Sequence, residues 1–153
     1  VRFAQDHREF LSVALPRGKG WFDWRARDDD RVRSAIRLPF EGTLFDVENN
    51  GFWPVSWGER PSSTAGRLSV VEQQVGAWPQ LVPLFGHRYL PGAPHGPGAP
   101  VFSVQQTDVV LYGNDLLHYF AKEFGTTRPL SDSTLSIDGL EPWSLLAYGH
   151  NVP

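Results

Sequence analysis

Histidines, carboxylates and serines are the residues of this chain that could support hydrolysis, and they are dispersed along its 153 positions. A hydrolytic site would combine His87 or His118 with Asp108 or Asp115, and a serine would act as the nucleophile. No G-x-S-x-G turn is present, and no serine lies in another recognisable nucleophile motif. The sequence therefore predicts no catalytic residues, and we expect a protein that is not an enzyme.

A metal site would have to gather His87, His95, His118 and Asp108, because imidazole and carboxylate groups are common zinc ligands. These residues form neither an H-E-x-x-H motif nor a closely spaced histidine pair, and the absence of cysteine excludes thiolate ligands and disulfides. The acidic triplet at 28–30 lacks the alternating ligands and the glycine of a calcium loop, so we interpret it as a helix cap. We expect no metal and no cofactor.

Polar and aromatic residues near the middle of the sequence indicate a different kind of site. The residues expected to form a polar network are His87, Arg88, Gln106, Asp108 and Tyr112. The residues expected to contact a partner are Trp53, Trp57, Arg60 and Tyr89, which include the types enriched at binding hot spots. Two interpretations remain open. The cluster is either a buried network in which Asp108 pairs with Arg88 or His87, or a rigid cleft that presents aromatic and arginine anchors.

The segment from Trp78 to Phe124 has the densest apolar patterning and is expected to position these residues. It comprises an apolar stretch over 81–89, a loop rich in proline and glycine over 91–100, an inner strand over Val101–Tyr112 and a helix over Asn114–Phe124. β-Branched and aromatic residues predict the strand, Asn114 is the expected N-cap of the helix, and Gly125 is its expected end. A hairpin through the loop would lay the apolar stretch beside the strand. Alternation along that strand places Asp108 on a largely apolar face.

The whole chain, residues 1–153, is expected to form one α+β domain in which helices pack against a mixed or antiparallel sheet. The remaining expected elements are, in order, a helix over 2–14, a short helix that Pro39 ends, a strand over 44–47, a turn at 49–51, a helix from 62–64 to about 75, an extended polar connection after Gly125, and a final turn that docks Trp143.

Composition excludes some classes of partner. The net charge is −3, from 14 basic and 17 acidic residues, and no basic patch stands out, so nucleic acid is not expected to bind. No apolar run approaches the roughly 20 residues of a membrane helix, and the default expectation is a cytoplasmic protein. The six tryptophans point to an interaction surface or to a core rich in aromatic rings. The sequence does not indicate an oligomeric state.

Three segments carry a family resemblance. They read F-D-V-E-N-N-G-F-W-P-V-S-W-G-E-R-P from Phe45, L-V-P-L-F-G-H-R-Y-L-P from Leu81, and P-V-F-S-V-Q-Q-T-D-V-V-L-Y-G from Pro100. Over roughly Leu44–Phe124 the chain resembles a group of uncharacterised bacterial proteins associated with the SUKH superfamily, the relatives of the yeast cell-wall assembly regulator.

This resemblance implies an α+β domain and a function in protein binding. Many bacterial members of the superfamily are immunity proteins, which bind and neutralise a polymorphic toxin and have no catalytic residues to carry over. The alternative is a module that binds a small molecule or a carbohydrate, with or without an unrecognised hydrolase activity, around Trp53, Trp57 and His87. A deep closed pocket among these residues would favour the alternative, and a shallow surface would favour a protein partner.

Overall fold

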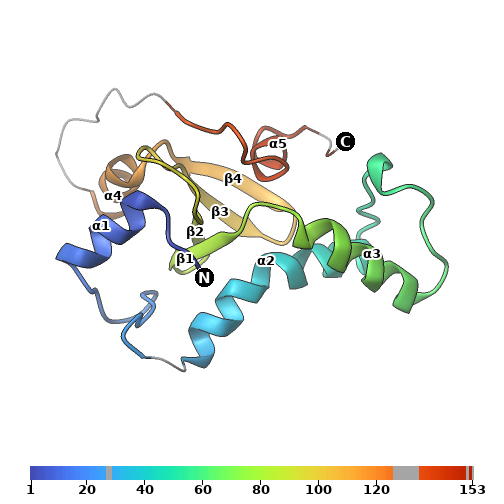
Figure 1. Ribbon diagram of the computed structural model, residues 1–153, viewed down its shortest axis with the longest axis horizontal. Helices are drawn as coiled ribbons and strands as arrows, with labels where there is room; N and C mark the ends of the chain where they lie inside the picture. The colour runs from blue at the N-terminus through green and yellow to red at the C-terminus, as the bar shows by residue number, and fades with distance from the viewer. Residues whose placement is uncertain (27–28, 126–134, 151, 153) are drawn as a thin grey trace.

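A meander of four antiparallel strands forms the centre of the computed structural model, which describes residues 1–26, 29–125, 135–150 and 152. Each strand pairs with the next one along the chain, so the order in the sheet is β1-β2-β3-β4 (Figure 1). The strands are β1 (Leu81–Phe85), β2 (Arg88–Pro91), β3 (Val101–Gln105) and β4 (Asp108–Gly113).

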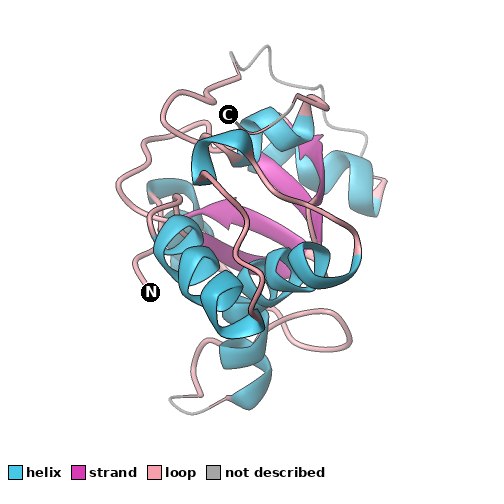
Figure 2. Cartoon of the chain, turned by 90° about the vertical axis from the view of Figure 1, so that its right-hand side faces the viewer, coloured by secondary structure: helices cyan, strands magenta, loops and turns pink. Residues whose placement is uncertain are grey.

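Helices surround this sheet, and the fold is α+β as expected (Figures 1 and 2). The described residues form α1 (Gln5–Val13), α2 (Asp30–Asn49), the 3₁₀ turn η1 (Val55–Trp57), α3 (Thr64–Gly76), α4 (Leu116–Phe124) and α5 (Trp143–Ala147). No helix in this part of the chain combines the length and the apolar character needed to cross a membrane.

Each face of the sheet carries its own hydrophobic core, although Val110 of β4 is 48% exposed. Adjacent residues of a strand point to opposite faces, so Phe102 packs in one core with Trp143 of α5, whereas Val101 packs in the other with Tyr119 of α4. A third core joins α2 and α3 and includes Val47. The prediction that Trp143 docks is confirmed, because its side chain is buried and its Nε1 donates a hydrogen bond of 2.7 Å to the carbonyl oxygen of Pro79.

The single strand expected over Val101–Tyr112 is wrong, because the chain reverses in the middle of it. β3 and β4 form a hairpin whose last paired residues are Gln105 and Asp108. Gln106 adopts a φ of 60°, a left-handed conformation that favours glycine or asparagine, so the sequence carried no ordinary signal for this turn. Asp46 of α2 holds the turn, since its Oδ2 accepts hydrogen bonds from the Thr107 amide at 2.8 Å and the Thr107 hydroxyl at 2.6 Å.

The prediction that Pro39 ends a short helix is also wrong. α2 runs through Pro39 for 20 residues and includes positions 44–47, which were expected to form a strand. A proline inside a helix removes one backbone donor and leaves the carbonyl four residues earlier without its partner. Here that carbonyl belongs to Ala35, and the hydroxyl of Tyr89 donates to it at 2.9 Å. A contact from the sheet therefore supplies the donor that the helix lacks.

Most of the helix ends agree with the capping signals in the sequence. Asp29 caps α2 by accepting from the amide of Arg31 at 2.8 Å, and Ser63 caps α3 by accepting from the amide of Gly66 at 3.1 Å. α4 ends at Gly125, as predicted, with a left-handed φ of 66°. The N-cap of α4 is Asp115 rather than Asn114, because the carboxylate of Asp115 accepts from the amide of His118. The polar connection expected after Gly125 falls largely on residues 126–134, which lie outside the described residues.

Candidate functional site

The four residues expected to contact a partner do not share one accessible surface. Tyr89 is 1% exposed and belongs to the core under α5, and Trp57 is 8% exposed and belongs to the core between α2 and α3. The ring of Trp57 packs against the rings of Phe52, Trp53 and Trp78, at centroid distances of 5.8, 5.3 and 6.3 Å. The expectation that Trp57 and Tyr89 anchor a partner is therefore corrected, and Trp53 and Arg60 retain access to solvent.

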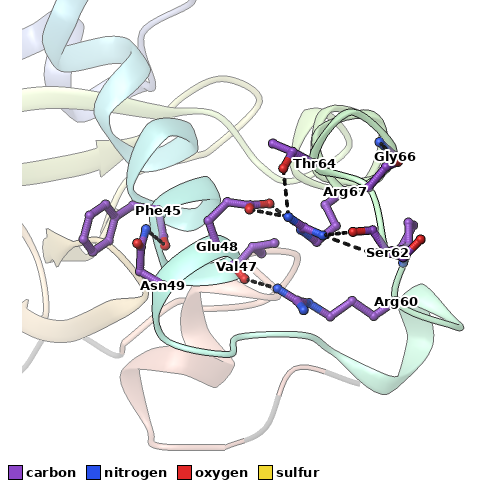
Figure 3. Close-up of polar contacts among 11 residues, drawn as sticks. Phe45, Val47, Glu48, Asn49, Arg60, Ser62, Thr64, Gly66 and Arg67 are labelled. Atoms are coloured by element: carbon purple, nitrogen blue, oxygen red, sulfur yellow. Dashed lines mark hydrogen bonds and ion pairs between the residues drawn. The ribbon is translucent and has the colours of Figure 1, made fainter.

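Trp53 and Arg60 lie in the loop between α2 and α3, which we call the 50–63 loop. The indole Nε1 of Trp53 donates to the carbonyl oxygen of Gly58 at 2.8 Å and so closes the loop on itself. The guanidinium of Arg60 lies 6.0 Å from the centroid of the Trp53 ring. Its Nη2 donates at 2.7 Å to the carbonyl oxygen of Val47 (Figure 3). Because the last carbonyls of a helix lack helical partners, this bond caps α2 and ties the loop to it.

An ion pair fixes the far end of the same loop. Arg67 of α3 binds both carboxylate oxygens of Glu48 on α2, at 2.5 and 2.6 Å, and also donates to the carbonyl oxygen of Ser62 at 2.7 Å (Figure 3). The hydrogen bonds from Arg67 hold the pKa of Glu48 below its ordinary value, and those to Glu48 raise the pKa of Arg67. This bidentate geometry is the preferred arrangement of arginine with a carboxylate. The end of α2, the loop and the start of α3 therefore form one fixed unit.

Among the mostly polar residues that the 50–63 loop exposes, one apolar side chain and one cation stand out. Val55, at the start of η1, is 89% exposed, and Arg60 is exposed beside the half-buried Trp53. Phe45 is also exposed but points away from Arg60 and Arg67 (Figure 3), so it belongs to a different face. The sequence drew attention to the two tryptophans of this segment, and only the structure identified Val55 as its most accessible apolar side chain.

The expected polar network separates into two places. His87, Arg88 and Tyr112 come together, whereas Gln106 and Asp108 lie at the β3–β4 turn. Asp108 is exposed, which contradicts the expectation that it is buried and paired with Arg88 or His87. The reason is the hairpin, because Asp108 opposes Gln105 at the turn whereas Arg88 opposes Ser103 further along β3.

The carboxylate partner of Arg88 is Glu123 of α4, which the sequence interpretation missed. The Nε of Arg88 lies 3.6 Å from Glu123 Oε2, and its Nη1 donates to the hydroxyl of Ser103 at 2.9 Å and contacts the ring of His87. The guanidinium also stacks 3.9 Å from the centroid of the Tyr112 ring. Glu123 lies four residues after Tyr119, which is one helical turn along the buried stripe of α4, and that spacing was the available signal.

The opposite charges of Arg88 and Glu123 lie close together, and the contacts of this cluster join α4 to the sheet. Partial burial, aided by the charge of Arg88, lowers the pKa of His87. Burial, aided by the charge of Glu123, raises the pKa of Tyr119. Lys122 lies 4.1 Å from the centroid of the Tyr112 ring and donates to the Tyr112 carbonyl oxygen at 3.3 Å. These contacts hold α4 against β4, so we interpret the cluster as structural.

His87 is also separate from the two tryptophans with which it was grouped for the ligand-binding alternative. Three of the hollows on the described part of the surface have volumes of about 500, 350 and 190 Å³, and none of these three is lined by Trp53, Trp57 or His87. These three hollows therefore give no support to a small-molecule site at that residue group. Across the described ranges, no group of three histidine or acidic side chains could hold a metal ion.

Comparison of the chain with models of known protein families, with curated proteins and with solved structures found no match. Function must therefore be inferred from the residues of this chain and from the way they are held.

Proposed function

We propose that this protein is a non-catalytic, cytoplasmic binding protein, an immunity protein that binds and neutralises a polymorphic toxin with fixed stoichiometry. The observation that carries the proposal is the 50–63 loop, which displays Trp53, Val55 and Arg60 on a backbone held by hydrogen bonds. The resemblance to SUKH proteins over this same segment supports the proposal.

The fixed loop suits protein recognition for an energetic reason. Ordering a flexible loop on binding costs free energy, and a loop already held at both ends avoids much of that cost. At the α2 end the amide of Phe52 donates to the carbonyl oxygen of Asp46. At the α3 end Arg60 binds Val47, and Arg67 binds Glu48 and Ser62. Tryptophan and arginine are the types that most often dominate binding energy, and a central residue of this kind contributes ~2 kcal/mol or more.

The acidic balance of the chain supports a basic partner. The formal net charge is −3, and opposite net charges accelerate encounter through electrostatic steering. A toxin that cleaves nucleic acid has a basic surface, because it must approach a polyanion. Association with such a partner should therefore slow as the ionic strength rises.

Co-purification with the protein encoded by the neighbouring gene tests the proposal. We expect Trp53→Ala, Val55→Asp and Arg60→Ala each to weaken the complex at least about tenfold, which corresponds to about 1.4 kcal/mol. Tyr148→Ala is a matched control for the aromatic truncation, because Tyr148 is exposed on the C-terminal side of α5. If all three loop variants fold and bind as well as the wild type, the proposed surface is wrong. If the purified protein turns over a substrate and binds no partner, the proposed function is wrong.

A further inference from the structure

The hollow of about 500 Å³ lies between α1 and α4, far along the chain from the 50–63 loop. The two helices lie next to each other (Figure 1), and the rings of Phe10 and Phe120 meet across the space at a centroid distance of 5.1 Å. Leu116 lines the same space from the first turn of α4. We call this hollow the α1–α4 groove, and its floor is apolar.

Two apolar side chains at the rim of the α1–α4 groove remain in water. Val13, at the end of α1, is 84% exposed, and Leu117 of α4 is 56% exposed. Together with the apolar floor, these two side chains form a small apolar surface that a partner can reach.

All three charged residues that line the groove are acidic: Asp6, Glu9 and Asp115. Asp6 is held in place because its Oδ2 accepts from the amides of Gly98 and Ala99, at 2.8 and 2.9 Å. Asp115 is held as the N-cap of α4. Glu9 is exposed and accepts from Gln5 one turn earlier. The groove therefore combines an apolar floor with fixed negative charge.

We propose that the α1–α4 groove binds an amphipathic helix of a partner protein, with an apolar stripe on one face and lysine or arginine beside it. An apolar trough between two helices accepts the i, i+3, i+4, i+7 side chains of a third helix. The acidic lining of the groove complements basic residues flanking such a stripe.

The same charges argue against other occupants of the groove. An anionic membrane surface would be repelled by Asp6, Glu9 and Asp115. A second copy of the chain docked by two-fold symmetry would bring two such acidic rims together, because a two-fold interface contacts itself. This inference does not depend on the function proposed for the 50–63 loop, since the two surfaces share no residue.

A synthetic peptide can test the groove directly. The probe is a 15-residue helix-forming peptide with leucine at i, i+3, i+4 and i+7 positions and lysine beside them. The control peptide has the same leucine pattern with glutamate in place of lysine. We expect the lysine peptide to bind one-to-one, to shift the amide resonances of α1 and α4, and to bind more weakly as salt is added. The glutamate peptide should not bind.

Matched variants make the outcome specific to the groove. Val13→Lys should weaken binding of the lysine peptide at least about tenfold, which is 1.4 kcal/mol. Val55→Lys makes the same change at an equally exposed valine of the 50–63 loop and should change binding less than about twofold. Glu9→Gln removes one charge with little change of shape and should reduce both affinity and salt dependence. Equal effects of Val13→Lys and Val55→Lys, resonance shifts elsewhere on the protein, or no binding of the lysine peptide would each overturn the proposal.

Discussion

The hydroxyl of Tyr89 donates a hydrogen bond of 2.9 Å to the carbonyl oxygen of Ala35, joining β2 to the N-terminal half of α2. This is the carbonyl that Pro39 leaves without a helical donor. The bond therefore allows α2 to continue through a proline and fixes where the helix lies on the sheet. Burial also raises the pKa of Tyr89 to about 12, so the hydroxyl remains a donor throughout the neutral range.

Removing the hydroxyl should destabilise the protein in a way that depends on Pro39. Tyr89→Phe leaves a buried carbonyl without a donor, and we expect a loss of about 1–3 kcal/mol in the free energy of unfolding. In a Pro39→Ala background the restored amide of residue 39 can bond to Ala35, so the same substitution should cost less. Urea unfolding of the four proteins in this double-mutant cycle measures the difference. Equal costs in the two backgrounds would contradict this account.

Gly42 of α2 should resist a substitution that normally strengthens helices. Replacing glycine by alanine inside a helix usually stabilises it by about 1 kcal/mol. A Cβ at Gly42 would lie 2.7 Å from the Cα of Gln106, so the β3–β4 turn would have to move. We therefore expect Gly42→Ala to lower the melting temperature. Gly76→Ala is the control, because a Cβ there meets nothing within 4 Å, and it should leave the melting temperature unchanged or raise it.

Glu123, rather than Asp108, should matter for stability. Glu123→Ala leaves the largely buried guanidinium of Arg88 without its carboxylate. The cost should fall between the ~0.2–1 kcal/mol of an exposed ion pair and the ~3–5 kcal/mol of a buried pair broken on one side. Asp108 is exposed, so Asp108→Ala should stay within about ±0.5 kcal/mol. Chemical denaturation measures the free energy of unfolding of both variants. A larger loss for Asp108→Ala than for Glu123→Ala would show that Glu123 is not the partner of Arg88.

His7 should make the protein sensitive to mild acid. Its side chain is fully buried between Phe3 and Trp24, and burial lowers its pKa to about 4. Between pH 6.5 and 4 the unfolded chain binds a proton that the folded protein does not, so stability falls as the pH falls through this window. The loss approaches about 3 kcal/mol at its lower end.

Melting temperatures recorded from pH 7 to pH 4 test the role of His7. His7→Phe keeps a flat ring in the core and removes the titrating group, so its melting temperature should vary less with pH than that of the wild type. His150→Gln is the control, since His150 is exposed and should leave the wild-type pH dependence intact. If the melting temperature of His7→Phe falls with decreasing pH as much as that of the wild type, another group is responsible for the sensitivity to acid.

The amino-acid sequence by itself determined the helix boundaries whose signals are local. Ser63 and the Gly66 amide that it caps lie three residues apart, and Gly125 needs only its own freedom to adopt a positive φ to end α4. In each case the interacting groups are close in the chain, so their types and spacing are enough.

Tertiary structure decided the features that depend on distant partners. Pro39 remains inside a helix because Tyr89, 54 positions from Ala35, supplies a donor. Gln106 turns the chain while Asp46, 61 positions from Thr107, holds the turn. That turn moves Asp108 into solvent and leaves Glu123 as the partner of Arg88.

The candidate site depended on packing in the same way. Trp53, Trp57 and Tyr89 are equally suited to binding by type, yet Trp57 and Tyr89 are covered by neighbours from other segments, whereas Val55 is left in water. The type of a side chain defines which interactions it can make. Which side chains a partner can reach is set by the packing of segments that are far apart in the chain.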